Sequence, residues 1–176
     1  MQNWTMAPYT PMSLHLETER LRLQPWTESD SEDLCALMSE RENLTRTPTV
    51  ERAREVIAEG IARRATTGIA LLHIRRRDEG DFIGYCGLLV GRATLEEPEI
   101  AYELFKRVHG NGYATEAARA VLDAAVATGR KRLWSTVRTW NTPSFRVLEK
   151  LGFERDHVAS AEDGGADLVW LTRALP

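Results

Sequence analysis

The segment with the clearest chemical meaning is R-V-H-G-N-G-Y-A-T-E-A, residues 107–117. It follows a run typical of a β-strand over residues 98–105 and opens an alanine-rich helix. The first N–H groups of a helix have no internal partner and lie at the positive end of its dipole, so they bind anions. Gly110 and Gly112 permit unusual backbone angles and place no side chain in the way of a phosphate. The segment therefore predicts a site for a phosphorylated ligand.

Two widespread phosphate-binding motifs do not match this segment. A P-loop requires Gly-x-x-x-x-Gly-Lys-Ser/Thr, and no Lys-Ser or Lys-Thr pair follows the glycines. The dinucleotide fingerprint requires a third glycine where Thr115 stands. The glycines alone are also consistent with a turn that only caps the helix.

A second motif, N-T-P-S-F-R-V-L-E-K-L-G-F, occupies residues 141–153. In order and spacing, the two motifs resemble the acyl-CoA pyrophosphate loop and the second signature of the GNAT acetyltransferases. Together with L-E-T-E-R-L-R-L at residues 16–23, they are similar to the ribosomal-protein N-acetyltransferase branch, the RimJ/RimL-like group. The resemblance covers residues 14–175, nearly the whole chain, and implies an enzyme that uses acetyl-CoA.

The composition is typical of one soluble globular domain. The chain has 176 residues, of which 43% are apolar and 28% charged. Its net charge of −3 gives no general attraction to nucleic acid, and the short basic runs at residues 75–77 and 130–132 are expected to be solvated. Two cysteines, Cys35 and Cys86, form no disulfide framework, so we expect buried thiols and a cytoplasmic location.

The N-terminal residues carry no targeting signal that the sequence makes evident. No run of 18 apolar residues predicts a membrane span. Residues 1–13 lack the basic and apolar regions of a signal peptide, and we expect a flexible arm there, followed by a single domain over residues 14–176. In the alternative, Trp4 and Tyr9 dock this arm on the body or on a second subunit.

Apolar–polar patterns predict the elements that position the motifs. Strands are expected over residues 21–25, 70–75, 81–89, 99–105, 133–140 and 167–173, with the second and third forming a hairpin. Helices are expected to begin at residue 28 and to cover residues 51–66, 114–128 and 142–151, the last with Thr142 as N-cap and Pro143 as its first residue. The order β-α-α-β-β-β-α-β-α-β is what the resemblance implies. It implies an α/β (α+β) GNAT fold, with a central mixed, mostly antiparallel sheet flanked by helices and acyl-CoA bound at the loop between strand 4 and helix 3.

Acetyl transfer from a thioester to an amine requires a bound cofactor, a neutral amine, a stabilised oxyanion and a leaving thiolate. The N–H groups of residues 107–114 would hold the cofactor phosphates. The resemblance adds that residues 104–106 pair with the pantetheine arm and that the Leu104 N–H group faces the thioester carbonyl. The expected cofactor-binding residues are thus Leu104, Phe105, Lys106, Arg107, Val108, His109, Gly110, Asn111, Gly112, Tyr113, Ala114, Thr115, Asn141 and Ser144.

Asn141 and Ser144 stand at the start of the short helix. The Asn141 amide is expected to bind the cofactor, or alternatively to bond only its own turn. The resemblance makes Ser144 the candidate proton donor to the thiolate, because Leu148 stands where many members carry a tyrosine. A serine that only caps the helix is the alternative for Ser144.

Glu99 and Glu103 are the candidates for the general base. A period of two places both on one face of their strand, although solvated strand carboxylates would show the same spacing. An α-amine of pKa ~7.7–8.0 is already roughly a tenth neutral at pH 7, whereas a lysine amine of pKa ~10.4 is neutral to less than ~0.1%. A weakly defined base therefore favours an α-amine acceptor.

The remaining candidates concern the acceptor. His73 is expected to be a hydrogen-bonded or half-exposed strand residue, and the four histidines lack the spacing of a metal site. Residues 41–50 and 53–66 are expected to form the acceptor wall, and Trp26, or Trp140 beside Asn141, to line the pocket.

These observations predict an acetyl-CoA-dependent N-acetyltransferase that acts by direct attack in a ternary complex on a primary amine. The branch resemblance indicates the α-amine of a protein N-terminus. A small-molecule amine, such as an amino acid, polyamine or drug, is the alternative within the same class. A non-catalytic acyl-CoA sensor is the alternative outside it. The resemblance also implies a homodimer, and the expected partners include neither nucleic acid nor a membrane.

Overall fold

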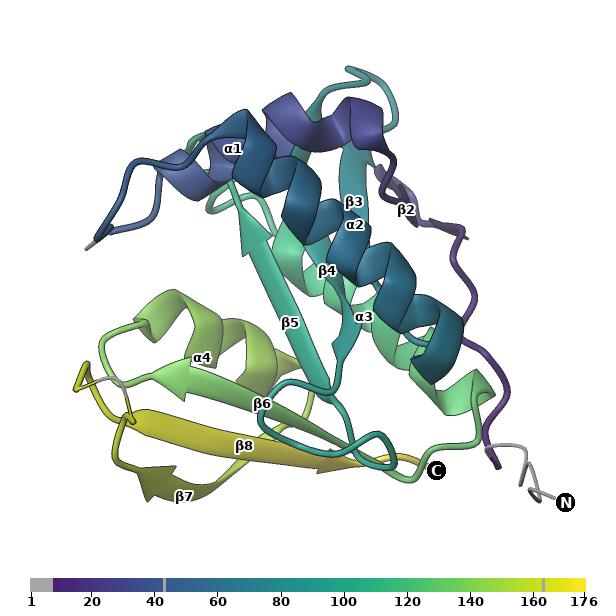
Figure 1. Cartoon of the computed structure of the whole chain (residues 1–176). Coiled ribbons are helices and arrows are strands. Elements are labelled where there is room, and N and C mark those ends of the chain that lie inside the picture. Colours follow the sequence, from purple (N-terminus) through teal and green to yellow (C-terminus); the bar gives the residue numbers. More distant parts are fainter. Residues whose placement is uncertain (1–7, 43, 163) are drawn as a thin grey trace, which may run out of the picture.

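The computed structural model describes residues 8–42, 44–162 and 164–176. Their strands form one sheet in the order β1-β2-β3-β4-β5-β6-β8-β7 (Figure 1). The strands are β1 (Leu16–Glu17), β2 (Leu21–Pro25), β3 (Leu71–Arg76), β4 (Phe82–Leu89), β5 (Glu99–Leu104), β6 (Arg132–Arg138), β7 (Glu154–Ala159) and β8 (Leu168–Ala174). All neighbours are antiparallel except β5 and β6.

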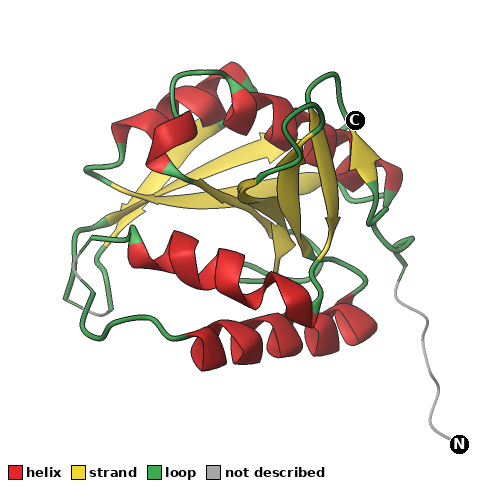
Figure 2. Ribbon diagram, turned by 90° about the horizontal axis from the view of Figure 1, so that it is seen from above, coloured by secondary structure: helices red, strands yellow, loops and turns green. Residues whose placement is uncertain are grey.

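Helices cover both faces of this sheet. They are α1 (Ser31–Ser39), α2 (Val50–Thr67), α3 (Tyr113–Ala127) and α4 (Thr142–Lys150), with short 3₁₀ turns at Glu28–Asp30 and Lys106–Val108. Figure 2 shows the sheet between two helical layers, α1 and α2 on one face and α3 and α4 on the other. The predicted mixed, mostly antiparallel sheet flanked by helices is confirmed.

The core lies on both faces of the central strands. Strand residues Leu21, Leu23, Leu72 and Ile74 have no exposed surface, as the alternation of apolar residues predicts. Helix α3 packs against the sheet through small residues, since Ala117, Ala118, Val121 and Ala125 are fully buried. Their size lets the helix, and therefore the loop before it, approach the sheet closely.

The sheet divides between its two parallel strands. The β5–β6 ladder consists of one pair, Glu99 with Trp134, supported by a hydrogen bond from the Ser135 hydroxyl to the Ile100 carbonyl at 3.2 Å. Beyond that point the strands diverge (Figure 1). The divergence opens a wedge between the β1–β5 part and the β6–β8 part of the sheet.

Two strands and one cap differ from the predictions. The sequence did not indicate β1 or β7, because β1 has two residues and β7 is a mostly exposed edge strand of sequence E-R-D-H-V-A without apolar alternation. Thr142 is not the N-cap of α4. Asn141 takes that place, because its side-chain oxygen accepts a hydrogen bond from the Ser144 N–H group at 3.4 Å.

The described part of the predicted arm lies against the body. The Thr10 N–H group donates to the Thr128 carbonyl at 3.1 Å, and the Met12 N–H group donates to Gly68 at 2.8 Å. The Met12 side chain is 3% exposed and joins the core. Trp4 and the rest of residues 1–7 lie outside the described residues.

Arg130 contradicts the expectation of a solvated basic run. Its side chain is 2% exposed, donates to the Leu95 carbonyl at 3.0 Å and lies 4.5 Å from the centre of the Tyr9 ring. Burial lowers the pKa of its guanidinium. The arm and the end of α3 bury this arginine, which periodicity alone does not reveal.

Two further predictions concern the state of the cysteines and the presence of membrane-spanning segments. Cys86 is buried and Cys35 half-buried, and both are free thiols. Burial raises the pKa of Cys86. Within the described ranges, no helix has the length and apolar character needed to cross a bilayer.

Candidate active site

The predicted phosphate loop connects β5 to α3. Gly110 and Gly112 adopt φ angles of 80° and 79°, in the left-handed region that favours glycine, and Gly112 is the N-cap of α3. A Cβ atom on Gly110 would meet no atom within 4 Å. The loop is therefore open where a cofactor phosphate would approach the helix N-terminus.

The N–H groups of the predicted segment are not all available to a ligand. Those of Phe105, Val108 and His109 donate to backbone carbonyls, and that of Lys106 donates to the Glu40 carboxylate at 2.9 Å. No described residue accepts a hydrogen bond from the N–H groups of residues 110–112, and the first N–H groups of α3 have no partner within the helix. From Phe105 to Thr115, the N–H groups of Arg107 and of residues 110–115 thus remain without a partner among the described residues, whereas the others are satisfied.

The loop side chains brace the loop. Arg107 donates to the Phe82 carbonyl at 2.9 Å and pairs with Asp81 at 2.9 Å. His109 bonds the Leu104 carbonyl through Nε2 at 3.0 Å, and the Asn111 amide donates to Val108 at 2.9 Å. These side chains are used in contacts within the protein, so the backbone of the loop is the part that a ligand could contact.

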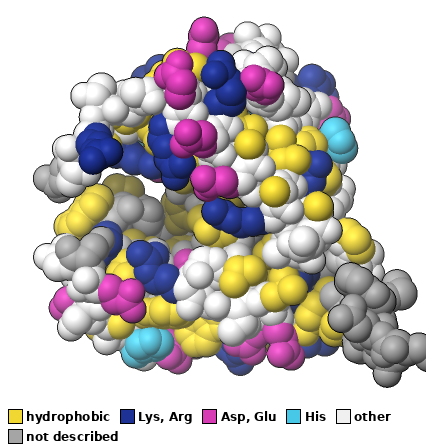
Figure 3. All heavy atoms as spheres, in the orientation of Figure 1, with side chains coloured by type: hydrophobic (Ala, Val, Ile, Leu, Met, Phe, Trp, Pro, Cys, Tyr) yellow, Lys and Arg dark blue, Asp and Glu magenta, His cyan; other side chains and the backbone are white. Residues whose placement is uncertain are grey.

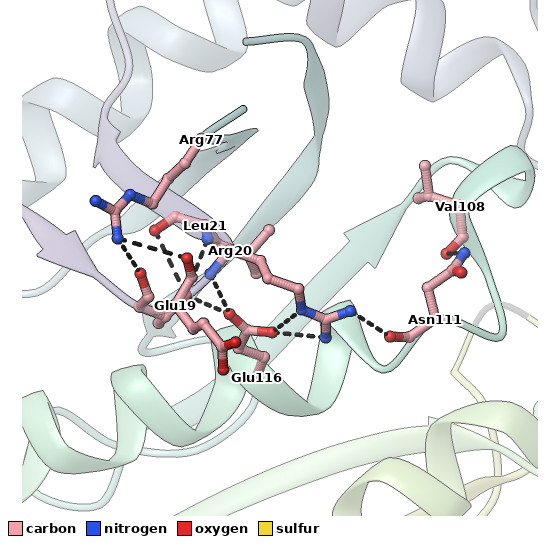
Figure 4. A network of polar contacts seen from close by, with 8 residues as sticks. Glu19, Arg20, Leu21, Arg77, Val108, Asn111 and Glu116 are labelled. Atoms are coloured by element: carbon pink, nitrogen blue, oxygen red, sulfur yellow. Dashed lines mark hydrogen bonds and ion pairs between the residues drawn. The ribbon is translucent and has the colours of Figure 1, made fainter. Parts of the chain in front are cut away.

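A polar network ties the loop to the start of β2 (Figure 4). Glu116 accepts hydrogen bonds from Arg20 Nε at 2.7 Å, from the Arg20 N–H group at 2.9 Å and from the Thr18 hydroxyl at 2.6 Å. Arg20 also donates to the Asn111 carbonyl at 2.9 Å and lies 4.4 Å from the centre of the Tyr113 ring. Both segments belong to the recognised motifs, but nothing in the sequence links their side chains.

The wedge contains a polar cavity of about 210 Å³. Tyr102, Asn141 and Ser144 line it, and the Tyr102 hydroxyl donates to the Ser144 carbonyl at 3.1 Å. Burial raises the pKa of Tyr102. Figure 3 shows the hollow between the half of the molecule that carries α1 and α2 and the half that carries α4 and β8. Sequence analysis missed Tyr102, because a strand tyrosine carries no motif.

The β5 backbone presents donors to the wedge. The Phe105 N–H group donates to the Ile83 carbonyl of β4. Since N–H groups alternate along an antiparallel ladder, those of Leu104 and Tyr102 point away from β4, toward the wedge. The Leu104 N–H group is therefore not used by the β4–β5 ladder.

Glu99 and Glu103 lie on one face of β5, opposite Leu89 and Tyr85 of β4. Glu103 accepts hydrogen bonds from Arg41 Nε at 3.0 Å to both oxygens and from the Tyr85 hydroxyl at 3.3 Å.

Glu99 is not a solvated strand carboxylate. It is 5% exposed, and it accepts hydrogen bonds from the Arg92 N–H group at 2.6 Å and the Thr136 hydroxyl at 2.9 Å. It lines the wedge cavity on the face opposite Tyr102. Glu99 is thus fixed by these two hydrogen bonds. Glu103 instead contacts Arg41, which lines a second cavity.

A second cavity of about 430 Å³ lies between α1–α2 and strands β3–β4. Arg41 and Tyr85, the partners of Glu103, line it together with Trp26. Trp140 is 60% exposed and does not line this cavity. Among the described residues of the 41–50 loop, Arg41 alone lines this cavity. Helix α2 lines it with Val56, Ile57, Gly60, Ile61, Arg63, Arg64 and Thr67.

His73 differs from its expectation of a satisfied or half-exposed residue. It is 5% exposed, and its Nδ1 atom has no hydrogen-bond partner. Its ring packs 5.7 Å from Trp26, and its Nε2 atom lies 3.9 Å from Asp30. Burial lowers the pKa of His73, although Asp30 opposes the shift. No group of three metal-ligating side chains occurs in the described part of the chain.

Comparison with known proteins identifies relatives across most of the chain. A family model described as "Acetyltransferase (GNAT) domain" matches residues 20–154. The uncharacterized N-acetyltransferase p20 of Bacillus licheniformis is 30% identical over 154 residues, which span 80% of this chain and 83% of the relative.

Solved structures share the fold. An acetyltransferase of the GNAT family from Bacillus anthracis superposes with a TM-score of 0.76 at 22% identity, over 91% of this chain and 98% of the other. The ribosomal-protein-S5-alanine acetyltransferase of Vibrio fischeri gives 0.76 at 18% identity, over 92% and 97%. YncA of Salmonella typhimurium, solved with its cofactor acetyl-CoA, gives 0.71 at 16% identity, over 89% and 94%.

Proposed function

Since the chain belongs to the GNAT acetyltransferase family, and is therefore an acyltransferase that uses acetyl-CoA, we propose that it acetylates the α-amine of a protein N-terminus. The observation that carries this proposal is the wedge between β5 and β6. It joins Asn141 and Ser144 on one face of the sheet to Glu99 on the other. A thioester held from one face would therefore meet an amine that approaches from the other.

The loop fits the cofactor that the family uses. Its open glycine backbone and the start of α3 would hold the pyrophosphate through residues 110–115. The Leu104 N–H group would face the thioester carbonyl, where one preorganised donor is worth ~3 kcal/mol. Asn141 uses its oxygen to cap α4, and its amide nitrogen remains as a donor toward the cofactor.

Acetyl-CoA supplies a thioester whose carbonyl carbon accepts the amine and whose sulfur leaves as a thiolate. Ser144 lies in the first turn of α4, where its hydroxyl and the helix dipole would stabilise negative charge on that sulfur. Tyr102 fixes this turn through the Ser144 carbonyl. The Leu148 side chain is fully buried in the core, so it leaves this task to Ser144.

The environment of Glu103 supports an α-amine acceptor. Its carboxylate already accepts hydrogen bonds from Arg41 and Tyr85, so these partners engage it before any amine arrives. An α-amine, roughly a tenth neutral at pH 7, needs little help, whereas a lysine amine needs a strong base. Glu99 or Glu103 would then take the proton through water as the amine attacks.

The enclosed acceptor cavity favours one alternative, a small-molecule amine. Its walls are mainly apolar, and the described lining residues include three arginines but no carboxylate. Polyamines and other polycations would find no countercharge there. A small acceptor would therefore be an amine whose other groups are apolar, uncharged or negatively charged, such as an amino acid.

The test is release of free CoA from acetyl-CoA, measured with a thiol reagent against peptides, amino acids and polyamines. We expect release with peptides that begin with Ser or Ala. Release with amino acids alone would move the function to the small-molecule alternative. Acetyl-CoA binding without release for any acceptor would contradict the transferase assignment and favour a sensor.

A further inference from the structure

We propose that Arg20 and Glu116 form a positioning pair, which holds the phosphate loop in its anion-binding conformation without touching the cofactor. This inference rests on the proposed placement of the pyrophosphate at residues 110–115. The two residues are 96 positions apart in sequence, and their ion pair has a shortest N–O distance of 2.6 Å (Figure 4).

The pair acts on one peptide group of the loop. Arg20 Nη1 donates to the carbonyl oxygen of Asn111 at 2.9 Å. In a trans peptide the next N–H group points the opposite way, so this bond directs the Gly112 N–H group away from Arg20. Without it, that peptide, which joins Asn111 to a glycine with positive φ, can rotate at little cost, which would turn a carbonyl toward the anion.

Glu116 holds the guanidinium in place. It accepts from Arg20 Nε and also from the Arg20 N–H group, so the side chain and the backbone of one residue are fixed together. Burial acts to raise the pKa of Glu116, but the Thr18 hydroxyl and Arg20 outweigh it and lower the pKa. The carboxylate therefore stays ionised near neutral pH and keeps the arginine on the loop.

The same pair balances the charge beside the anion site. Glu116 lies in the first turn of α3, where an unpaired carboxylate would repel a pyrophosphate. Arg20 cancels that charge and stacks on Tyr113, the first residue of the helix. Loss of Arg20 would thus both release the Asn111 carbonyl and expose a negative charge.

The experiment measures acetyl-CoA affinity by calorimetry and kcat/KM for two donors, acetyl-CoA and S-acetyl-pantetheine, which lacks the pyrophosphate. For Arg20→Ala we expect the acetyl-CoA Kd to rise about tenfold, the size of one lost charge-assisted hydrogen bond. The S-acetyl-pantetheine kcat/KM should stay within about twofold of wild type, because that donor does not use the loop.

Two further variants separate positioning from charge. Glu116→Gln keeps the shape of the side chain but frees the Arg20 guanidinium. We therefore expect a loss of acetyl-CoA affinity, although the variant removes a negative charge beside the anion site. Arg22→Ala removes an exposed ion pair between β2 and Glu17 of β1 and should leave the Kd unchanged. An Arg20→Ala protein that binds acetyl-CoA normally, or that loses both donors equally, would overturn the inference. Failure of the wild type to bind acetyl-CoA would instead overturn the proposed function.

Discussion

On the α3–α4 face of the sheet, the candidate site comes from two short continuous segments, whereas on the α1–α2 face it is assembled from distant residues. The phosphate loop and the start of α4 each carry their function in local backbone geometry. The proposed acceptor cavity combines Trp26, Arg41 and Tyr85 with the side chains of α2. The first face is therefore sensitive to backbone changes, and the second to changes of side-chain volume and charge.

The largest effect is expected from Gly112→Glu. The residue has φ 79° at the N-terminus of α3, so a side chain strains the turn and places a carboxylate beside the pyrophosphate. We expect the acetyl-CoA Kd to rise at least about 100-fold, or about 2.7 kcal/mol, by calorimetry.

The matched control is Gly129→Glu, immediately after the other end of α3. Gly129 has φ 87° and open space around a Cβ atom, so its backbone strain is similar but its charge is remote. Its acetyl-CoA affinity should remain close to wild type. Unchanged affinity in a folded Gly112→Glu protein would remove the pyrophosphate from this loop.

The second prediction tests the proposed acceptor cavity by filling part of its volume with a larger side chain. Gly60 lines the acceptor cavity from α2, and a Cβ atom there would meet nothing within 4 Å. Gly60→Phe should raise the acceptor KM about tenfold by filling space, at a cost near 1.4 kcal/mol. Its acetyl-CoA Kd should not change, and a change in both constants would show that the two faces are not independent.

The contrast between the faces also explains what the sequence could predict. Gly110, Gly112, Asn141 and Ser144 follow from motifs in which function lies in adjacent residues. Most strands and all four helices of the described chain follow from apolar periodicity. β7 does not, because a solvent-exposed edge strand needs no apolar face.

The remainder depends on contacts between distant segments. The bond from Tyr102 to Ser144 and the pair of Arg41 with Glu103 join residues 42 and 62 positions apart. Side chains of these types are usually solvated, so no local pattern distinguishes them. Burial of His73 likewise results from the packing of Trp26 over β3, which periodicity does not encode.

The third prediction compares the two faces in acid. The pKa of His73 is lowered from 6.5 by burial, so its neutral form contributes stability above that pH, which is lost as pH falls through the folded value. Nearby Asp30 and, on the loop face, Glu116 have lowered pKa values and stay ionised at pH 5.5. We therefore expect the free energy of unfolding to fall between pH 7 and pH 5.5.

Urea unfolding at the two pH values measures this loss. His73→Gln should flatten the pH dependence, because the amide does not titrate, whereas the exposed His15→Gln should not. Hydrogen exchange should locate the acid loosening at α1 and β3 rather than at the phosphate loop. An equal pH dependence in wild type and His73→Gln would assign the effect to other groups.

The last prediction compares two glycines that have equal space and different backbones. A Cβ atom on Gly60 or on Gly110 would meet no atom within 4 Å. Gly60 lies within α2, whereas Gly110 has φ 80°. Gly60→Ala should stabilise the fold by about 0.5–1 kcal/mol through helix propensity. Gly110→Ala should destabilise it by about 1–2 kcal/mol, the cost of a left-handed alanine. Urea unfolding gives both values, and a stabilising Gly110→Ala would mean that the loop does not need its left-handed turn, which the proposed anion site requires.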